Sequence, residues 1–460
     1  MKGKVIKYLA ICVALTVIIN MAASMVSTSA AATYKVSKKS FRDINFWNII
    51  KKYDKNKDEC LNRKELSKIE KLKTTKSNAT LFKKVKSLRG IEYLFNLKKI
   101  DWYGIKVKTI NLTYNEKLKT FKCKSNNVKE LHLSELSALS KIVVGKCPKL
   151  EIVDIDYNDK LKRLDLSRAK NLKKVFLEDV NIKRINIRKN KKLKKLWISG
   201  SNIKNIDVAN NKKLECLVLT LAKLKKSDVS KNKQLKTLEI NDNKIKKLDV
   251  SKNKKLRSLN CGDNRIRTLN VRSNKKLRYL YCRNNQLKNL KVSGLKNLKE
   301  LNVSYNKLNA INVAKLKKLT DIKVGHNKIK KLNLSHNKKI SELNCDNNSL
   351  SNLNLTHNKK LYHVYCKRNK IRNLKINNRF VMEKLDCRHN RLRKISFGKT
   401  KNITELMVSH NKLKKLDLSK IKNIAYLYVK NNPMKSINIR HMKNRFSMYI
   451  EGNKKLKVYI

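Results

Sequence analysis

The stretch LKTLEINDNKIKKLDVSKNKK, residues 235–255, decides the fold. A second copy starts at Leu256, and the same register returns at Leu277, Leu298, Leu319, Ile340, Leu361, Met382, Ile403 and Ile424. Towards the N-terminus it continues through Leu214 and Leu193 to Leu172, so the period is 21 residues from there onward. A fixed period of this length indicates a repeat architecture in which each repeat contacts only its neighbours.

Each unit consists of a 10-residue half and an 11-residue half, and both halves carry the pattern Leu-x-x-Leu-x-hydrophobic. In the first half, Leu238 and Ile240 alternate with polar residues, which predicts a short strand with its apolar side chains inward. Asn243 follows this strand and recurs in later units. An inward Asn can bond backbone groups that a tight turn leaves unpaired, so we expect a structural ladder. The second half is expected to form the opposite wall, as short strands or as 3₁₀ turns.

The pattern L-x-x-L-x-L-x-x-N/C-x-L resembles the leucine-rich repeat, and the match runs from about Leu97 to Ile460. The short unit and its "LDVSKN" half are similar to secreted leucine-rich repeat proteins of Gram-positive bacteria, the internalin-like group. This resemblance implies an α/β repeat solenoid, with a parallel β-sheet on the concave face of an arc and a small helical N-terminal cap. It also implies a protein that binds rather than catalyses.

Three domains are expected along the chain. Residues 1–32 are typical of a secretory signal, because three lysines precede an apolar run and a cluster of small residues follows it. An uncleaved membrane anchor is the alternative. Residues 33–96 lack the repeat and are expected to form the cap, and residues 97–460 form the solenoid. Between Leu139 and Leu172 the spacing is 33, which adds one 11-residue half-unit. No second apolar run of about 18 residues follows the signal, so we expect no transmembrane helix in the mature chain.

The cap contains a sequence that resembles an EF-hand calcium loop, flanked by an amphipathic helix pattern and a second helix expected near residues 62–72. The resemblance implies calcium as a cofactor, with the following ligand residues: Asp54, Asn56, Asp58, Cys60 through its carbonyl, Asn62 and Glu65. Glu59 departs from the pattern, because a Gly normally makes the sharp turn at this position. The alternative is a loop that only joins two helices.

Charge is the second outstanding feature. The chain has 113 Lys and Arg against 34 Asp and Glu, a formal net charge of +79. Such an excess attracts polyanions, and because Lys dominates over Arg it favours diffuse phosphate contact over sequence-specific nucleic-acid readout. For an exported chain we expect anionic cell-envelope polymers or other polyanions as partners. The alternative is that the lysines only keep a repetitive protein soluble.

Cysteine usage does not indicate a disulfide scaffold. Six cysteines occupy one repeat position that alternates with Ile and Val, namely Cys123, Cys261, Cys282, Cys345, Cys366 and Cys387. A position shared by these residue types is a buried small hydrophobe, so we expect free thiols. No C-x-x-C occurs, which leaves a zinc site without support.

Aromatic and imidazole side chains gather at the positions expected to face outward from the first-half strands. The candidate ligand-binding residues on the concave face are Tyr279, Tyr281, Tyr305, His363, Tyr365, His389, Tyr426 and Tyr428. Exposed Tyr and His on a rigid sheet are typical of recognition surfaces. The alternative is that these residues stabilise cross-strand pairs.

No catalytic constellation is present, since no histidine accompanies a recognisable nucleophile motif. Two functions follow. The first is a secreted, cell-surface-associated recognition or adhesion protein that binds a protein or glycan on its concave sheet, with a Lys-rich flank on anionic envelope polymers. The second is a structural, polyanion-binding envelope component with no discrete ligand.

Overall fold

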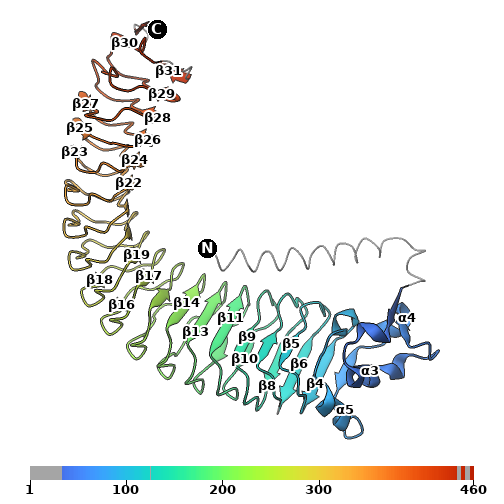
Figure 1. The fold of residues 1–460 in the computed structure, drawn as a ribbon. Coiled ribbons are helices and arrows are strands. Elements are labelled where there is room, and N and C mark those ends of the chain that lie inside the picture. The colour runs from blue at the N-terminus through green and yellow to red at the C-terminus, as the bar shows by residue number, and fades with distance from the viewer. Residues whose placement is uncertain (1–33, 125, 443–446, 451–455, 460) are drawn as a thin grey trace. The chain divides into compact units, whose positions relative to one another are not determined.

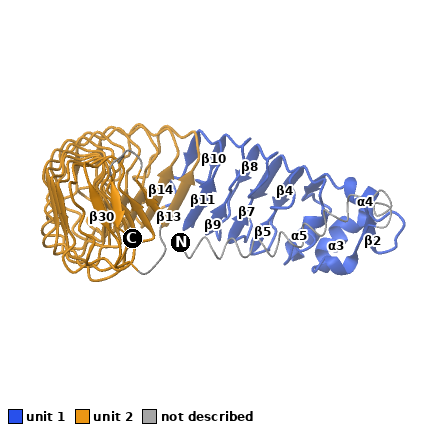
Figure 2. Ribbon diagram, turned by 90° about the horizontal axis from the view of Figure 1, so that it is seen from above, with its two compact units in different colours: residues 1–190 blue, residues 191–460 orange. Residues whose placement is uncertain are grey.

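The computed structural model describes residues 34–459 except 125, 443–446 and 451–455. The expected signal at residues 1–32 lies outside the described residues. The chain divides into two compact units, residues 1–190 and residues 191–460, which are coloured separately in Figure 2. Each unit is a parallel-strand solenoid, and unit 1 begins with a small helical region. The fold is the leucine-rich repeat solenoid that the sequence predicted.

The N-terminal region of unit 1 contains short helices and one antiparallel pair of short strands. Asp43 caps the first helix, because its side chain accepts hydrogen bonds from the backbone N–H groups of Asn45 and Phe46. The second helix is shorter than expected and ends at Ser67, after which the chain enters a strand. The elements are β1 Lys35–Ser37, η1 Lys38–Ser40, α3 Ile44–Ile50, η2 Lys51–Tyr53, β2 Cys60–Asn62, α4 Arg63–Ser67, α5 Ala79–Lys84 and η3 Ile91–Tyr93.

Two walls make up the solenoid of unit 1. The first wall contains β3 Lys71–Lys73, β4 Lys99–Tyr103, β6 Thr120–Lys124 and β8 Lys141–Val144, followed by β10 Arg163–Asp165 and β12 Arg184–Asn186. The second wall contains β5 Thr109–Asn111, β7 Glu130–His132, β9 Ile152–Asp154 and β11 Lys174–Glu178. All neighbouring pairs are parallel: β4 pairs with β6, β6 with β8, β7 with β9, and β9 with β11.

The extra half-unit exchanges the two walls. Successive half-units lie on opposite walls, so adding one shifts every later half-unit to the other side. First-half strands such as β6 lie on the first wall before the insertion, whereas the first-half strand β11 lies on the second wall and pairs with β9. β10 correspondingly lies against β8. The 33-residue spacing was visible in the sequence, but its effect on the faces was not predicted.

Unit 2 repeats the same construction with greater regularity. Its larger sheet contains β13 Lys195–Ser199, β14 Cys216–Thr220, β15 Thr237–Glu239, β17 Ser258–Asn260, β19 Tyr279–Tyr281, β20 Glu300–Asn302, β21 Asp321–Lys323, β22 Glu342–Asn344, β24 His363–Tyr365, β26 Met382–Asp386, β28 Ile403–Met407, β29 Tyr426–Tyr428 and β31 Ser447–Tyr449. Within this unit the larger sheet lines the concave side of the curve (Figure 1).

The opposite wall of unit 2 combines short strands with turns, and its described residues contain no 3₁₀ helix, so the first of the two expected alternatives occurs. Its strands are β16 Leu248–Asp249, β18 Leu269–Asn270, β23 Asn352–Leu355, β25 Asn373–Ile376, β27 Lys394–Ser396, β30 Ser436–Asn438 and β32 Lys457–Tyr459. The core lies between the walls. Leu238 and Ile240 of the larger sheet and Val250 of the opposite wall are completely buried. The periodic leucines therefore point inward, as predicted.

Two ladders of asparagine hold consecutive coils together in unit 2. The predicted one is formed by Asn243 and its repeats. The side chain of Asn264 donates to the carbonyls of Ile240, Cys261 and Gly262, and its oxygen accepts from the N–H of Ile245. The second ladder was not predicted. There Asn253 is fully buried and donates to the carbonyls of Val229 and Asn232.

Candidate ligand-binding face

The concave sheet of unit 2 presents two columns of outward residues. In each three-residue strand the middle residue is buried, as Leu280 is, and the first and third residues face solvent. The register places Tyr279 beside Glu300 and Tyr281 beside Asn302. We call the first residues column 1 and the third residues column 2. Neighbouring residues in a column lie about 4.8 Å apart, which is the strand spacing.

Column 1 contains an uninterrupted acidic run, formed by Glu300, Asp321 and Glu342 on adjacent strands. Lys323 of column 2 lies 3.6 Å from a carboxylate oxygen of Asp321 and 3.6 Å from one of Glu342. Tyr281 donates its hydroxyl to Glu300 at 2.5 Å. The run is unusual in a chain with so many lysines, and it gives this face a local charge opposite to that of the chain.

Partial burial changes the ionisation of this run. Burial raises the pKa of Asp321 to about 6, and its hydrogen bond with Glu342 acts in the same direction. The two carboxyl groups therefore share a proton more readily than isolated acids do. Burial, followed by the bond to Glu300, also raises the pKa of the Tyr281 hydroxyl, so this group remains a hydrogen-bond donor at neutral pH.

His363 continues column 1 beyond the acidic run. One ring nitrogen lies 3.8 Å from Glu342 and the other lies 3.4 Å from Glu383. Tyr365 stands beside it in column 2, with a ring centroid 6.1 Å from that of His363. Lys384 and Glu405 follow on the next strands and form an ion pair at 2.7 Å. After the acidic run, column 1 thus carries an imidazole, a cation and a further acidic residue.

The far end of the sheet is aromatic. Tyr426 stands in column 1, before Ser447, with 46 % of its surface exposed. Tyr428 follows in column 2 and stacks on Tyr449 of the next strand, with ring centroids 4.3 Å apart and planes within 2° of each other. Such a pair presents a flat apolar edge to solvent. Cross-strand stacking also stabilises the sheet, so a structural role of these tyrosines is compatible with a role in recognition.

A third row of side chains lies at the turn that follows each strand, and we call it the rim. Its residues adopt left-handed φ angles, including +56° at Tyr305, +54° at His326, +53° at His389 and +58° at His410. The backbone is strained for such residues, and the asparagine ladder beneath supplies the compensating hydrogen bonds. The turn aligns neighbouring rim side chains so that they stack.

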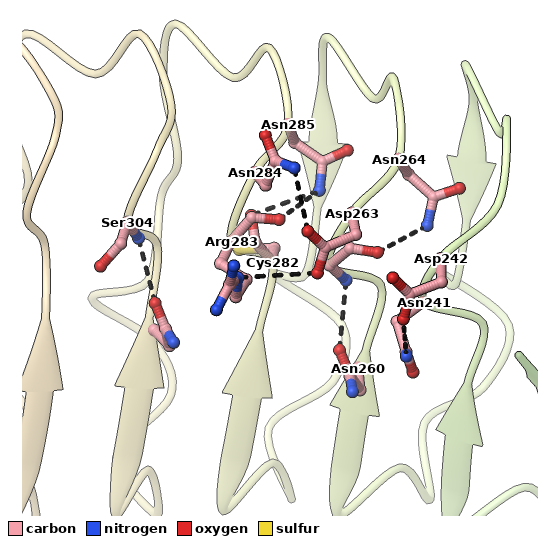
Figure 3. A network of polar contacts seen from close by, with 12 residues as sticks. Asn241, Asp242, Asn260, Asp263, Asn264, Cys282, Arg283, Asn284, Asn285 and Ser304 are labelled. Atoms are coloured by element: carbon pink, nitrogen blue, oxygen red, sulfur yellow. Dashed lines mark hydrogen bonds and ion pairs between the residues drawn. The ribbon is translucent and has the colours of Figure 1, made fainter. Parts of the chain in front are cut away.

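Stacking and hydrogen bonds connect the rim along the coils. The Tyr305 and His326 rings are 3.9 Å apart, and the His389 and His410 rings are 4.2 Å apart. In Figure 3, the Asn284 amide donates to Asp263 at 2.9 Å, and the ladder residues Asn264 and Asn285 directly follow these two residues in the sequence. The rim is therefore an ordered edge of the concave face.

The structure brings the eight predicted ligand-binding residues onto one face without gathering them in a pocket. Tyr279 and Tyr281 stand beside the acidic run, His363 and Tyr365 lie just past it, and the Tyr426 and Tyr428 pair lies further along. Tyr305 and His389 are rim residues. The contribution of Asp321 and Glu342 was not weighed in the sequence, although their spacing of 21 residues shows that they are neighbours.

Lysines dominate the side of unit 2 away from this face. In the coil that begins at Leu235, the exposed cations are Lys236, Lys244, Lys246, Lys247, Lys252, Lys254 and Lys255. Lys236 directly precedes β15, and the others lie in turns or in the second half-unit. Most lysines of unit 2 therefore lie away from the concave face, but Lys323 and Lys384 stand on it beside acidic residues.

The EF-hand-like loop of unit 1 shows part of the expected geometry. Glu59 has φ +56°, the conformation for which a Gly was expected, and one carboxylate oxygen of Asp54 is buried without a hydrogen-bond partner. Other ligand oxygens are engaged. Asp58 pairs with Lys35 at 2.8 Å, and Glu65 accepts from the N–H groups of residues 55 and 62.

These acidic groups do not converge. Across residues 34–459, with the stated gaps, the structure contains no cluster of three or more His, Cys, Asp or Glu side chains suited to a metal ion. Of the remaining candidates, Asn62 caps α4, and Cys60 is a half-buried free thiol in β2. The calcium site at Asp54, Asn56, Asp58, Cys60, Asn62 and Glu65 stays a prediction.

All nine cysteines within the described chain are unpaired. Cys261 and Cys282 on adjacent coils are completely buried, as are Cys345, Cys366 and Cys387. Burial raises the pKa of the Cys261 thiol to about 12, which keeps it protonated. These residues act as small hydrophobes in the core, as the sequence indicated. No helix in the described part of the chain has the length and apolar character needed to cross a membrane.

Comparison with known proteins supports the fold. A sequence profile described as "Leucine Rich repeats (2 copies)" matches residues 275–316. The functional domain of InlJ from Listeria monocytogenes, whose structure includes a cysteine ladder, is 23 % identical with a TM-score of 0.51, over 91 % of this chain and 81 % of that one. A leucine-rich repeat protein of Leptospira interrogans is 21 % identical with a TM-score of 0.55, over 76 % of this chain and 94 % of that one. No curated protein matches the sequence.

Proposed function

We propose that unit 2 is a recognition module that binds a protein or glycan ligand on its concave face. Leucine-rich repeat solenoids are typically binding scaffolds without enzymatic activity. The observation that carries the proposal is the composition of this face: an acidic run, exposed tyrosines and a stacked rim are held on a rigid sheet in a strongly basic chain. A rigid, pre-ordered surface loses little entropy on binding.

The lysines suggest where the module acts. We propose a secreted, cell-surface-associated adhesion protein whose basic side holds anionic envelope polymers, leaving the concave face free. Each phosphate contact releases a counterion, so this retention weakens as salt rises. Most lysines of unit 2 lie away from the concave face, and this arrangement supports two simultaneous interactions of different kinds.

A second candidate is a structural component that binds polyanions and has no discrete ligand. The observation that favours it is the number of lysines: 113 Lys and Arg exceed what solubility requires. In this case the tyrosines only stabilise the sheet. The two proposals differ in their response to salt, because charge-driven binding is screened and contact with aromatic side chains is not.

A binding screen separates the two. The protein is applied to arrays of glycans and of surface proteins at about 0.15 M and about 1 M NaCl, where the Debye length falls from about 8 Å to about 3 Å. We expect a ligand retained at high salt and lost in the triple variant Tyr281→Ala, Tyr365→Ala, Tyr428→Ala. The matched control is Tyr103→Ala with Tyr157→Ala, two exposed tyrosines of unit 1. If all binding disappears at high salt, the second candidate is correct.

A further inference from the structure

Unit 1 contains a groove of about 910 Å³, which is distinct from the concave face of unit 2. It lies where the lead-in residues 86–92 meet the second wall, near the starting ends of β5, β7 and β9. Its lining includes six cations, at Lys86, Arg89, Lys106, Lys108, Lys129 and Lys149. A groove of this size accommodates a ligand of several hundred Å³ rather than a single small ion.

The regular repeat places two lysines of one coil at the groove. Val107, Ile110 and Leu112 occupy the same positions in the coil from Leu97 as Ile245, Leu248 and Val250 do in the coil from Leu235. Val107 is buried in the core, and Lys106 and Lys108 on either side of it are exposed at the groove. Lys108 and Lys129 immediately precede the neighbouring strands β5 and β7, and a backbone hydrogen bond of 2.7 Å joins them.

The opposite edge of the groove is fixed by Asp43. One oxygen of this carboxylate caps α3, and the other accepts from the N–H groups of Lys86 and Ser87 at 2.6 and 3.1 Å. Burial acts to raise the pKa of Asp43, but these backbone bonds outweigh it and lower the pKa overall. Asp43 therefore stays ionised and holds the lead-in segment in place, so the groove is preformed.

The charges lining the groove are unbalanced. Glu92 is the one acidic residue in the lining, and its carboxylate accepts from the N–H of Gly90 at 2.8 Å. Within the described chain, no ion pair within 4 Å involves any of the six cations. Like charges held on adjacent strands repel, and a multiply charged anion between them relieves that repulsion.

The side chains indicate the kind of anion. Five of the six cations are lysines, whose compact ammonium groups suit phosphate and lack the fork that reads planar carboxylates. Tyr114 lines the same groove with 40 % of its surface exposed, and it offers an aromatic face to an organic body. We propose that this groove is a discrete binding site for a phosphate ester that carries several charges, such as one segment of a phosphodiester-linked polymer.

This site goes beyond the proposed function, because it requires a shaped groove, whereas diffuse retention requires only many lysines. The two make different predictions for a matched pair of variants. Lys108 and Lys129 occupy the same position in their coils as Lys225 and Lys246 do in unit 2. All four are exposed, but only the first pair lines the groove. Replacing either pair removes the same charge.

The experiment is isothermal titration of the full chain with tripolyphosphate. We expect one site to stand out from weaker, salt-sensitive binding. The double variant Lys108→Ala, Lys129→Ala should weaken binding at this site about tenfold or more. It should also reduce the steepness of the plot of log binding constant against log salt concentration by about one for each lysine. Lys225→Ala with Lys246→Ala should change binding at this site by less than about twofold. Tyr114→Ala should weaken binding of a phosphodiester polymer more than binding of tripolyphosphate.

Equal losses of tripolyphosphate affinity in the two lysine double variants would contradict a discrete binding site in the groove. They would not contradict diffuse retention of polyanions. Absence of a distinct site in the unchanged chain would contradict the discrete site as well. Circular dichroism verifies that each variant is folded. Competition then identifies the source of the phosphate. A soluble poly(glycerol phosphate) chain displaces tripolyphosphate if the site takes a polymer, and phosphatidylglycerol vesicles displace it if the site takes lipid headgroups.

Discussion

Units 1 and 2 are built from the same half-units, but they differ in how strictly the repeat length is kept. In unit 2 the 21-residue period gives a uniform sheet with aligned columns and a continuous rim. In unit 1 the chain adds a whole half-unit after Leu139, where the walls exchange, and residues 86–92, which precede the repeat, border a groove. Regular repeats thus provide an extended face, whereas a segment outside the repeat helps to form a local site.

The asparagine ladder shows the difference at the level of single residues. From Asn243 to Asn432, every coil of the described chain has an Asn at the equivalent position, and its side chain both accepts and donates hydrogen bonds. In unit 1 Asn126 accepts from the N–H of Ile105, but Cys147 occupies the equivalent position in the next coil. The Cys147 sulfur lies 3.9 Å from that of Cys123 and makes much weaker hydrogen bonds than an amide. Unit 2 should therefore depend on its ladder more strongly than unit 1 does.

The largest expected effect comes from breaking that ladder. Asn285→Ala removes three donated bonds, to the carbonyls of Cys261, Cys282 and Arg283, and one accepted from Ile266. Because the groups left behind are mostly buried, we expect unit 2 to lose about 4 kcal/mol of stability, at about 1–3 kcal/mol for each unsatisfied group. Urea denaturation followed by circular dichroism measures the loss.

Asn289→Ala is the control, because Asn289 is exposed in the same coil. Its effect should stay within about 0.5 kcal/mol. If Asn285→Ala were as mild as this control, the ladder would not be a source of stability, and the contrast between the two units would lose its energetic basis.

Much of the regular construction was predictable, because it is local. The inward leucines, the strand of each first half, the Asn243 ladder and the outward tyrosines all follow from a pattern read within one unit and repeated. The rim was harder to predict. Tyr305 and His326 stack because both adopt a left-handed turn, and nothing in their side chains indicates that conformation.

The irregular features depend on contacts between segments that are distant in sequence. The groove needs residues 86–92, held by Asp43, to lie against lysines of three successive coils, and no periodic pattern reports that packing. The exchange of walls follows from the 33-residue spacing only once successive half-units are known to alternate between walls. The raised pKa of Asp321 depends on burial, which the sequence does not give quantitatively.

The packing between neighbouring coils gives the next test of the difference between units 1 and 2. A Cβ atom added at Gly145 in unit 1 would lie 2.6 Å from Cγ and 3.1 Å from Cα of Lys124, whereas one added at Gly294 in unit 2 would meet nothing within 4 Å. We expect Gly145→Ala to destabilise unit 1 by about 1–3 kcal/mol, as overpacking does. Gly294→Ala should be neutral or stabilising by up to about 1 kcal/mol. Thermal unfolding of the two variants measures both effects, and equal effects would contradict the difference in packing.

The acidic run of unit 2 predicts a dependence on pH that unit 1 should not share. The pKa of Asp321 is raised to about 6 in the folded chain, so the folded state binds this proton more tightly than the unfolded state does. The resulting stabilisation is complete below the ordinary Asp value near 4 and is lost as pH rises through about 6. Asp321→Asn, which stays uncharged, should therefore be more stable than the unchanged chain at pH 7 by about 1–2 kcal/mol, and this advantage should vanish near pH 4.

Measuring the urea midpoint of both proteins across this range isolates the Asp321 contribution from the titration of the rest of the chain. Asp249→Asn is a suitable control, because bonds to Ser251 lower the pKa of that aspartate instead. An Asp321→Asn advantage that did not change between pH 4 and pH 7 would show that burial does not perturb this carboxyl group.

Calcium should act on unit 1 alone, with the smallest effect. Calcium binding requires Asp58 to leave Lys35, and Glu65 to release two backbone N–H groups, so part of the binding energy is spent on rearrangement. At a calcium concentration about ten times Kd, linkage gives a stabilisation of about 1.4 kcal/mol.

The fluorescence of Trp47 and Trp102 measures the unfolding of unit 1 in a Trp197→Phe background, and calcium should raise the melting temperature of this unit. Asp54→Ala should abolish this rise and Lys35→Gln should enlarge it, since the second variant frees Asp58. If calcium changed the melting temperature of neither the Trp197→Phe protein nor its Asp54→Ala and Lys35→Gln variants, the loop would only connect two helices.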